Sequence, residues 1–126
     1  MELTAEPKER AILVGFCRDA RERYLEEESL EELVELTTSA GAEVADVVIQ
    51  ERARPDPAYL IGQGKVDDLR ESVLIEQANL VIFNEDLTPA QLRNLEQSLD
   101  TKVIDRTELI LDIFAQRARS SEGKLQ

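Results

Sequence analysis

The sequence predicts an α/β domain of three layers, in which a mainly parallel four-stranded sheet carries helices on both faces. Two observations support this fold class. Short apolar runs rich in β-branched residues, typical of buried strands, alternate along the chain with segments of helical periodicity. Strands separated by helices pair in parallel through right-handed crossovers. At 126 residues the chain is also long enough to bury one core of its own.

The first third of the chain predicts two strands around one helix. The continuous apolar run Ala11–Cys17 is typical of a buried strand. Ser29 and Glu32 form a capping-box pattern, which predicts a helix that starts near Ser29. Gly41 stands where a C-terminal cap belongs, so the helix should end just before it. Glu43–Gln50 then predicts the second strand.

A longer loop separates this second strand from the second helix. Within it, Tyr59–Ile61 predicts a short extended piece, and Gly62–Lys65 precedes a segment of helical periodicity. The apolar residues of that helix recur at i, i+3, i+7 and i+8, which predicts one core-facing side. They are Val66, Leu69, Val73 and Leu74.

The next segment predicts two further strands with a helix between them. Asn79–Phe83 is the third expected strand and Lys102–Asp105 the fourth. Between them, Thr88 with Pro89 and Gln91 combines an N-cap, a proline at the first helical position and a capping-box residue. The core face of this helix should carry Leu92, Leu95 and Leu99.

The strand order predicts where a ligand would bind. The long loop can cross the sheet, so we expect the order 2-1-3-4 with a switch point between strands one and three, where open α/β sheets bind ligands. The strands end there at Phe16–Arg18 and Asn84–Asp86. Carboxylates at Asn84–Asp86 suit magnesium or acid–base chemistry, but the same residue types are ordinary turn formers, and the turn is the favoured interpretation.

Residues 105–126 predict a capped helix that is apolar on more than one side. Asp105 is the expected cap, with Glu108 three residues on. A helix on a sheet needs only one apolar stripe, so we expect something besides the sheet to cover it. The chain then turns basic at Arg117–Lys124 and ends without a stop signal, which predicts a continuation beyond Gln126. The apolar residues are Leu109, Ile110, Leu111, Ile113, Phe114, Ala115 and Ala118.

The composition excludes several classes of protein. The net charge of −12 argues against a domain that wraps nucleic acid, because phosphate contacts need clustered basic residues. The chain has no histidine and one cysteine, Cys17, so the usual zinc sites, an internal disulfide and histidine-based nucleophilic catalysis are all excluded. Cys17 is expected to be a small core residue. No apolar run approaches the roughly 20 residues of a membrane helix, and we expect a cytoplasmic protein.

Gly62, Gly64 and Lys65 form a weak candidate site for a phosphate. Two glycines and a lysine at a helix start can present free backbone N–H groups to an anion. The segment is not a P-loop, however, because Tyr59 and Val66 stand where that motif needs a glycine and a hydroxyl. A plain turn before a helix is the favoured interpretation, and a backbone docking surface is a further alternative.

Four segments together resemble the N-terminal domain of the HflX family of ribosome-associated GTPases. They are Glu26–Leu33, Pro55–Lys65, Asn84–Glu96 and Val103–Gln126, in the order of the family. One departure is Asn84, where many relatives carry aspartate, which further weakens a metal role there.

The polar opening residues predict a flexible lead-in at 1–9. The resemblance implies the α/β domain at 10–119, and at 120–126 the start of a connection to a helical hairpin and a Ras-like GTPase domain. GTP and magnesium are expected in that GTPase domain, with no cofactor in the present chain.

The resemblance also implies a function and partners. We expect a non-catalytic docking and regulatory domain that binds the large ribosomal subunit, and its own hairpin and GTPase domain in cis, within a protein that hydrolyses GTP and splits ribosomes. Two alternatives stay open: an ATP-binding module with weak hydrolysis of its own, and a structural module that packs on the GTPase domain. The expected partner-binding residues are Arg52, Arg54, Lys65, Arg106, Phe114, Arg117 and Arg119.

Overall fold

The computed structural model describes residues 8–125, with side chains through residue 119. Most of the predicted lead-in and the side chains of 120–126 lie outside these residues. Strands and helices alternate along the chain as the sequence predicts. The elements are β1 (Arg10–Cys17), α1 (Ala20–Ser39), β2 (Glu43–Glu51), α2 (Gln63–Glu76), β3 (Leu80–Phe83), α3 (Pro89–Leu99), β4 (Lys102–Asp105) and α4 (Arg106–Leu125).

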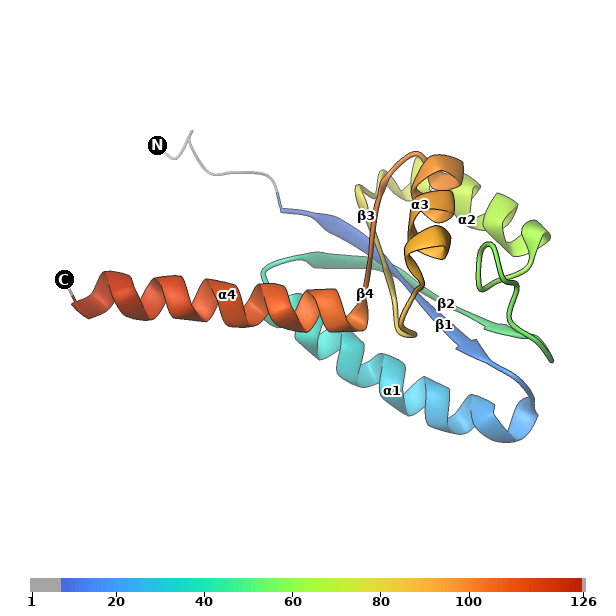
Figure 1. Cartoon of the computed structure of the whole chain (residues 1–126), viewed down its shortest axis with the longest axis horizontal. Helices are drawn as coiled ribbons and strands as arrows, with labels where there is room; N and C mark the ends of the chain where they lie inside the picture. Colours follow the sequence, from blue (N-terminus) through green and yellow to red (C-terminus); the bar gives the residue numbers. More distant parts are fainter. Residues whose placement is uncertain (1–7, 126) are drawn as a thin grey trace.

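The four strands form one sheet in the order β2-β1-β3-β4, and every neighbouring pair is parallel. This confirms the predicted order and its switch point between β1 and β3. Figure 1 shows α1 and α4 on one side of the sheet and α2 and α3 on the other. The predicted three-layer α/β architecture is therefore confirmed. Among residues 8–125, no helix is both long enough and apolar enough to span a bilayer.

Two apolar cores lie on the two faces of the sheet. Alternate residues of β1 face opposite sides, so Ile12 packs with α2 and α3, while Leu13 packs with α1 and α4. The first core also contains Val66, Leu69, Val73, Leu95 and Leu99, and the second contains Leu30, Leu33, Ile104, Leu109 and Ile113.

Helix α1 packs directly on the backbone of β1 at Gly15, where a side chain would have no room. A Cβ atom on Gly15 would stand 2.6 Å from Leu30 Cδ1 and 2.9 Å from Glu26 Oε2. Leu30 is itself buried, so it has little room to move away. The absence of a side chain at Gly15 thus determines how near the helix lies to the sheet.

The predicted start of α1 at Ser29 is wrong, since the helix begins nine residues earlier at Ala20. Asp19 is the N-cap, and its carboxylate accepts the backbone N–H of Glu22 at 3.0 Å. Glu22 in turn accepts the backbone N–H of Arg18 at 2.9 Å. Ser29 lies inside the helix, where its hydroxyl bonds to other elements. Gly41 follows the helix with a φ of 96°, as expected of a glycine at a helix end.

The predicted extended piece at Tyr59–Ile61 is also wrong, because the loop folds into a tight turn. Asp56 and Leu60 exchange backbone hydrogen bonds of 2.9 and 2.8 Å, and Leu60 has a φ of 67°, which non-glycine residues seldom adopt. The Asp56 carboxylate accepts the N–H groups of Ala58 and Tyr59. This turn inserts Leu60 and Ile61 into the core below α2 and α3.

One predicted core residue of α2 is exposed instead. Val66, Leu69 and Val73 are buried, but Leu74 is 72% exposed. At 100° per residue, position i+8 lies about 80° from position i, at the edge of the stripe. The sheet beneath α2 reaches Val73 but not Leu74.

Candidate functional site

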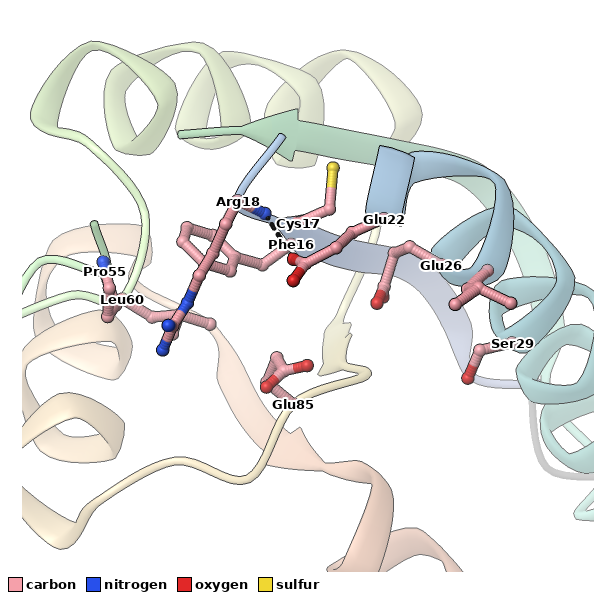
Figure 2. A pocket seen from close by; sticks show the side chains of 10 residues that line it. Phe16, Cys17, Arg18, Glu22, Glu26, Ser29, Pro55, Leu60 and Glu85 are labelled. Atoms are coloured by element: carbon pink, nitrogen blue, oxygen red, sulfur yellow. Dashed lines mark hydrogen bonds between the residues drawn. The ribbon is translucent and has the colours of Figure 1, made fainter. Parts of the chain in front are cut away.

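A cavity of about 450 Å³ lies at the switch point, where β1 and β3 end. Phe16 and Cys17 of β1 and Leu60 of the crossing loop form its apolar wall (Figure 2). The first half of α1 and the residue that follows Asn84 form the polar side. The remaining lining residues are Arg18, Glu22, Leu25, Glu26, Ser29, Pro55 and Glu85.

The polar side of this switch-point cavity is acidic. Glu22 and Glu26 of α1 and Glu85 after β3 surround the opening in Figure 2, with Arg18 as the cation that lines it. Partial burial raises the pKa of the Glu85 carboxyl, and the charges of Glu26 and Asp86 raise this pKa further. Such a lining disfavours phosphate. No group of three acidic or cysteine side chains in residues 8–119 is placed to hold a metal ion.

Cys17 is a poor nucleophile in this position. Its side chain is 2% exposed, and burial raises the pKa of the thiol, with Glu51 as the next cause. The thiolate is the reactive form of cysteine, so a raised pKa leaves the residue inert near neutral pH. The prediction of a small core residue is thus confirmed.

A polar network behind the cavity joins three elements. Asn84 donates its amide to Glu26 Oε2 at 2.8 Å and to Ser29 Oγ at 2.9 Å. Arg106, the first residue of α4, donates to Asn84 Oδ1 at 3.0 Å, to Ser29 Oγ at 2.9 Å and to Glu32 Oε1 at 3.0 Å. The network therefore ties α1, the end of β3 and the start of α4 together.

The glycine segment before α2 forms a helix start, as its favoured interpretation holds. Gly62 is the N-cap residue, and its N–H donates to Gln50 Oε1 at 2.8 Å. Gly62 has an ordinary φ of −70°, and a Cβ on Gly64 would meet no atom within 4 Å. Neither backbone conformation nor crowding thus requires a glycine at these positions. Lys65 is half-buried in the first turn of α2.

The expected partner-binding residues fall into separate places. Arg52 follows β2, donates to the backbone oxygen of exposed Arg54 at 2.9 Å, and lies beside Gly62. Arg106 is committed to the internal network, with 24% of its side chain exposed. Phe114, Arg117 and Arg119 are exposed along α4. Arg52, Arg54 and the glycine segment that holds Lys65 thus lie near one another. Phe114, Arg117 and Arg119 belong to a different element, α4.

Helix α4 leaves an apolar face uncovered, as its sequence predicts. Leu109 and Ile113 are buried against the sheet and α1. Leu111 and Phe114 are each 61% exposed, and Ala115 and Ala118 are exposed beside them. Figure 1 shows the second half of α4 running out past the sheet. The predicted cap is present, since Asp105 Oδ1 accepts the Glu108 N–H at 3.0 Å.

Sequence reasoning missed the residues that α1 contributes to the cavity. Glu22, Leu25 and Glu26 were not among the candidate site residues, because the helix was expected to begin near Ser29. The pattern Asp19-x-x-Glu22 was the available signal, since an N-cap residue followed at the third position by glutamate marks a helix start.

Comparisons with known proteins give the family of this fold. The family model described as "GTP-binding GTPase N-terminal" matches residues 27–115. GTPase HflX of Caldanaerobacter subterraneus subsp. tengcongensis is 49% identical over 126 residues, all of this chain and 28% of that relative. GTPase HflX of Escherichia coli K12 is 47% identical over 120 residues, which cover 94% of this chain and 27% of that protein.

A solved structure described as the SsGBP and GDP complex shares the fold. It has a TM-score of 0.65 and 23% identity, over 87% of this chain and 29% of that one. The present chain spans about 28% of the length of the curated relative from Caldanaerobacter. With the family model covering most of the sheet and its helices, the chain belongs to the GTP-binding GTPase N-terminal family, as an N-terminal domain of the HflX type.

Proposed function

We propose that this chain is the docking and regulatory domain of an HflX-like GTP-binding protein that associates with the large ribosomal subunit in the cytoplasm. The observation that carries the proposal is the uncovered face of α4. The root of this helix is fixed in the domain by Arg106, while Leu111 and Phe114 remain exposed. The HflX relatives are much longer than this chain, so other parts of such a protein are available to cover that face.

The proposal assigns nucleotide binding and regulation to different domains of the longer protein. GTP and magnesium are held by the GTPase domain of the longer protein, whose nucleotide hydrolysis this domain restrains or permits through α4. The switch-point cavity supports this assignment, because three carboxylates around it disfavour a nucleotide phosphate.

Contact with ribosomal RNA requires local basic surfaces, because the domain as a whole carries a charge of −12. Arg52, Arg54 and Lys65 lie at the end of the sheet where β2 finishes, and Arg117 and Arg119 lie along α4. We assign the contacts to these two groups. Arg106 is left out because its guanidinium is already bound by Asn84, Ser29 and Glu32.

The test compares three forms of the full-length protein with the wild type. The first lacks residues 1–126, the second carries Leu111→Ser with Phe114→Ser, and the control carries Leu74→Ser with Ile75→Ser on α2. The control pair is 72% and 75% exposed, so it removes similar apolar surface elsewhere. Large-subunit binding is measured by co-sedimentation, and GTP turnover by phosphate release.

We expect the truncated form and the α4 variant to lose subunit binding and to change GTP turnover, while the α2 control behaves as wild type. Wild-type values of both quantities in the truncated form would refute the proposal. Altered turnover with unchanged subunit binding would instead favour a structural module that packs on the GTPase domain.

A further inference from the structure

The edge of the sheet at β2 carries an apolar groove that the helix layer leaves open. On the face covered by α1 and α4, Val47 lies beside Leu13 of β1 in register. Leu13 is fully buried, whereas Val47 is 41% exposed, so the helix layer leaves the middle of the edge strand partly open although Val44 and Ile49 of β2 pack in the core with α1. A cavity of about 430 Å³ results, lined by Leu30, Val34, Val47, Val48 and Ile49, with Glu27 and Glu31 at its rim.

A second hollow on α1 shares Val34 with this cavity. Glu35, Thr38 and Ser39 are its other lining residues. From Glu27 to Ser39 the helix rises about 18 Å at 1.5 Å per residue. That length accommodates a partner helix of about 12 residues lying alongside α1.

The open edge of β2 does not favour an added strand. The backbone N–H of Val47, in the middle of the strand, is occupied by the carboxylate of its neighbour Asp46 at 2.8 Å. A side chain bonded in this way, with its charge at the edge, opposes β-sheet extension at that point. An occupant of the groove therefore has to lie on the face of β2 rather than prolong the sheet.

The rim of the groove is strongly acidic. Glu27 is paired with Arg23 at 3.4 Å, and Arg23 also reaches Glu51 at 3.8 Å, which closes one end. Glu31 makes no ion pair with any of residues 8–119 and is exposed. A neighbouring acidic hollow is formed by Glu28, Glu31, Glu32 and Glu35.

We propose that this groove binds an amphipathic helix of a partner protein, with its apolar stripe against Val34, Val47 and Ile49 and its lysine or arginine residues against the glutamates of α1. The apolar floor supplies the contact area, and the acidic rim selects for the basic flanks. An acidic rim of this kind repels the phosphates of nucleic acid. The inference is independent of the docking role proposed for α4, which lies at a different surface.

The probe for this groove is a synthetic peptide of about 14 residues, with leucines at helical spacing and lysines on both flanks. A matched peptide carries glutamate in place of every lysine. Binding to the 126-residue chain is measured by fluorescence anisotropy, and the site is located by amide chemical-shift changes. Two groove variants are Glu31→Lys and Val47→Thr. Their controls are Glu71→Lys and Ile75→Thr on α2, which change the net charge and the exposed apolar surface in the same way away from the groove.

We expect the lysine peptide to bind and to shift amides of β2 and of Glu27–Ser39, while the glutamate peptide does not bind. Glu31→Lys should weaken binding by about fivefold or more, whereas Glu71→Lys should have a much smaller effect. Equal losses from Glu31→Lys and Glu71→Lys would overturn the proposal, since they indicate general attraction to an acidic protein. A dimer in sedimentation that Val47→Thr dissociates would also overturn it, because a second copy of the chain would then be the occupant. Thermal unfolding verifies that each variant is folded.

Discussion

Arg106 illustrates how a single residue holds this domain together. Its guanidinium bonds to a backbone oxygen and two side chains contributed by α1, and to Asn84 after β3, although Ser29 lies 77 positions away in the sequence. The planar fork of arginine suits several acceptors at once, which an ammonium group does not match. Asn84 completes the arrangement, because its amide donates to Glu26 and its oxygen accepts from Arg106.

Replacement of Arg106 should destabilise the 126-residue chain. Arg106→Ala leaves the partly buried Asn84 Oδ1 without its donor and leaves Ser29 Oγ with the Asn84 amide alone, so we expect a loss of about 1–3 kcal/mol in the free energy of unfolding, measured by urea denaturation. Arg106→Lys should recover only part of this loss. Arg93→Ala on the exposed side of α3 is the control and should be nearly neutral. An Arg106→Ala chain as stable as the control would contradict a structural role for the network.

Glu85 should make stability depend on pH. Burial and the charges of Glu26 and Asp86 raise the pKa of this carboxyl in the folded chain above its unfolded value. Protons are then bound more tightly by the folded state, so the stability contributed by protonated Glu85 is present at low pH and is lost as pH rises through the raised pKa. We expect Glu85→Gln to be more stable than wild type at pH 7. The difference should vanish below the unfolded pKa, and a difference that grew on acidification would have the wrong sign.

At the scale of the element, α4 has two apolar faces with different roles. Ile113 is 9% exposed and belongs to the core, whereas its neighbour Phe114 is 61% exposed. In the 126-residue chain, Ile113→Ala should therefore cost about 2–5 kcal/mol, because it opens a cavity in a packed core. Phe114→Ala should change the free energy of unfolding by about 0.5 kcal/mol or less, because it removes no packed contact. Thermal and urea unfolding of the two variants measure both quantities, and similar costs would mean that Phe114 is packed in solution.

The close approach of α1 to β1 yields a second test at this scale. Gly15→Ala would push a methyl group against Leu30, which is buried and cannot turn away freely. We expect a loss of about 1–3 kcal/mol, as is usual when a core is overpacked. Leu30→Val in the same chain should relieve part of the clash, so the two changes together should cost less than their sum. Strict additivity would show that the two residues do not interfere.

Element type and order could be predicted from the sequence, whereas several boundaries could not. Thr88, Pro89 and Gln91 carry their own local signal, and the capping box is present as expected. Ser29 and Glu32 form the same sequence pattern, but they lie inside α1 and cap nothing, because the N-cap of this helix is Asp19. The left-handed φ of Leu60 accompanies burial of its side chain under α2 and α3, a tertiary contact that the local sequence does not reveal. Asp56, whose carboxylate accepts the N–H groups of Ala58 and Tyr59, was the local signal of a turn.

At the scale of the whole molecule, the candidate site was predictable only in its location. The strand order located the switch point, since topology follows from the alternation of elements. The side chains around the cavity come from positions as distant as Phe16 and Glu85, and their convergence depends on how α1 lies over the sheet. The sequence showed that α4 has more apolar residues than one face of a helix can hold. Which of these residues are exposed depends on where the sheet ends beneath the helix.

The net charge of −12 should make the domain sensitive to salt. A large charge of one sign destabilises a compact state through self-repulsion, and salt reduces this repulsion by shortening the Debye length from about 30 Å at 0.01 M to about 10 Å at 0.1 M. We expect the melting temperature to rise with sodium chloride over this range. A variant with Glu28→Gln and Glu35→Gln should start higher and gain less. A melting temperature that falls with salt would indicate that attractive ion pairs outweigh the repulsion.

The anchoring of α4 at one end has a mechanical consequence. Arg106 and Ile113 fix its first two turns, whereas the helix continues to Leu125, about 18 Å beyond Ile113 at 1.5 Å per residue. A tilt of about 10° at the root would carry the far end through about 3 Å over that length. A change of tilt at the root, where Arg106 and Ile113 hold α4 against the domain, would therefore displace the far end of the helix more than the residues beside the switch-point cavity.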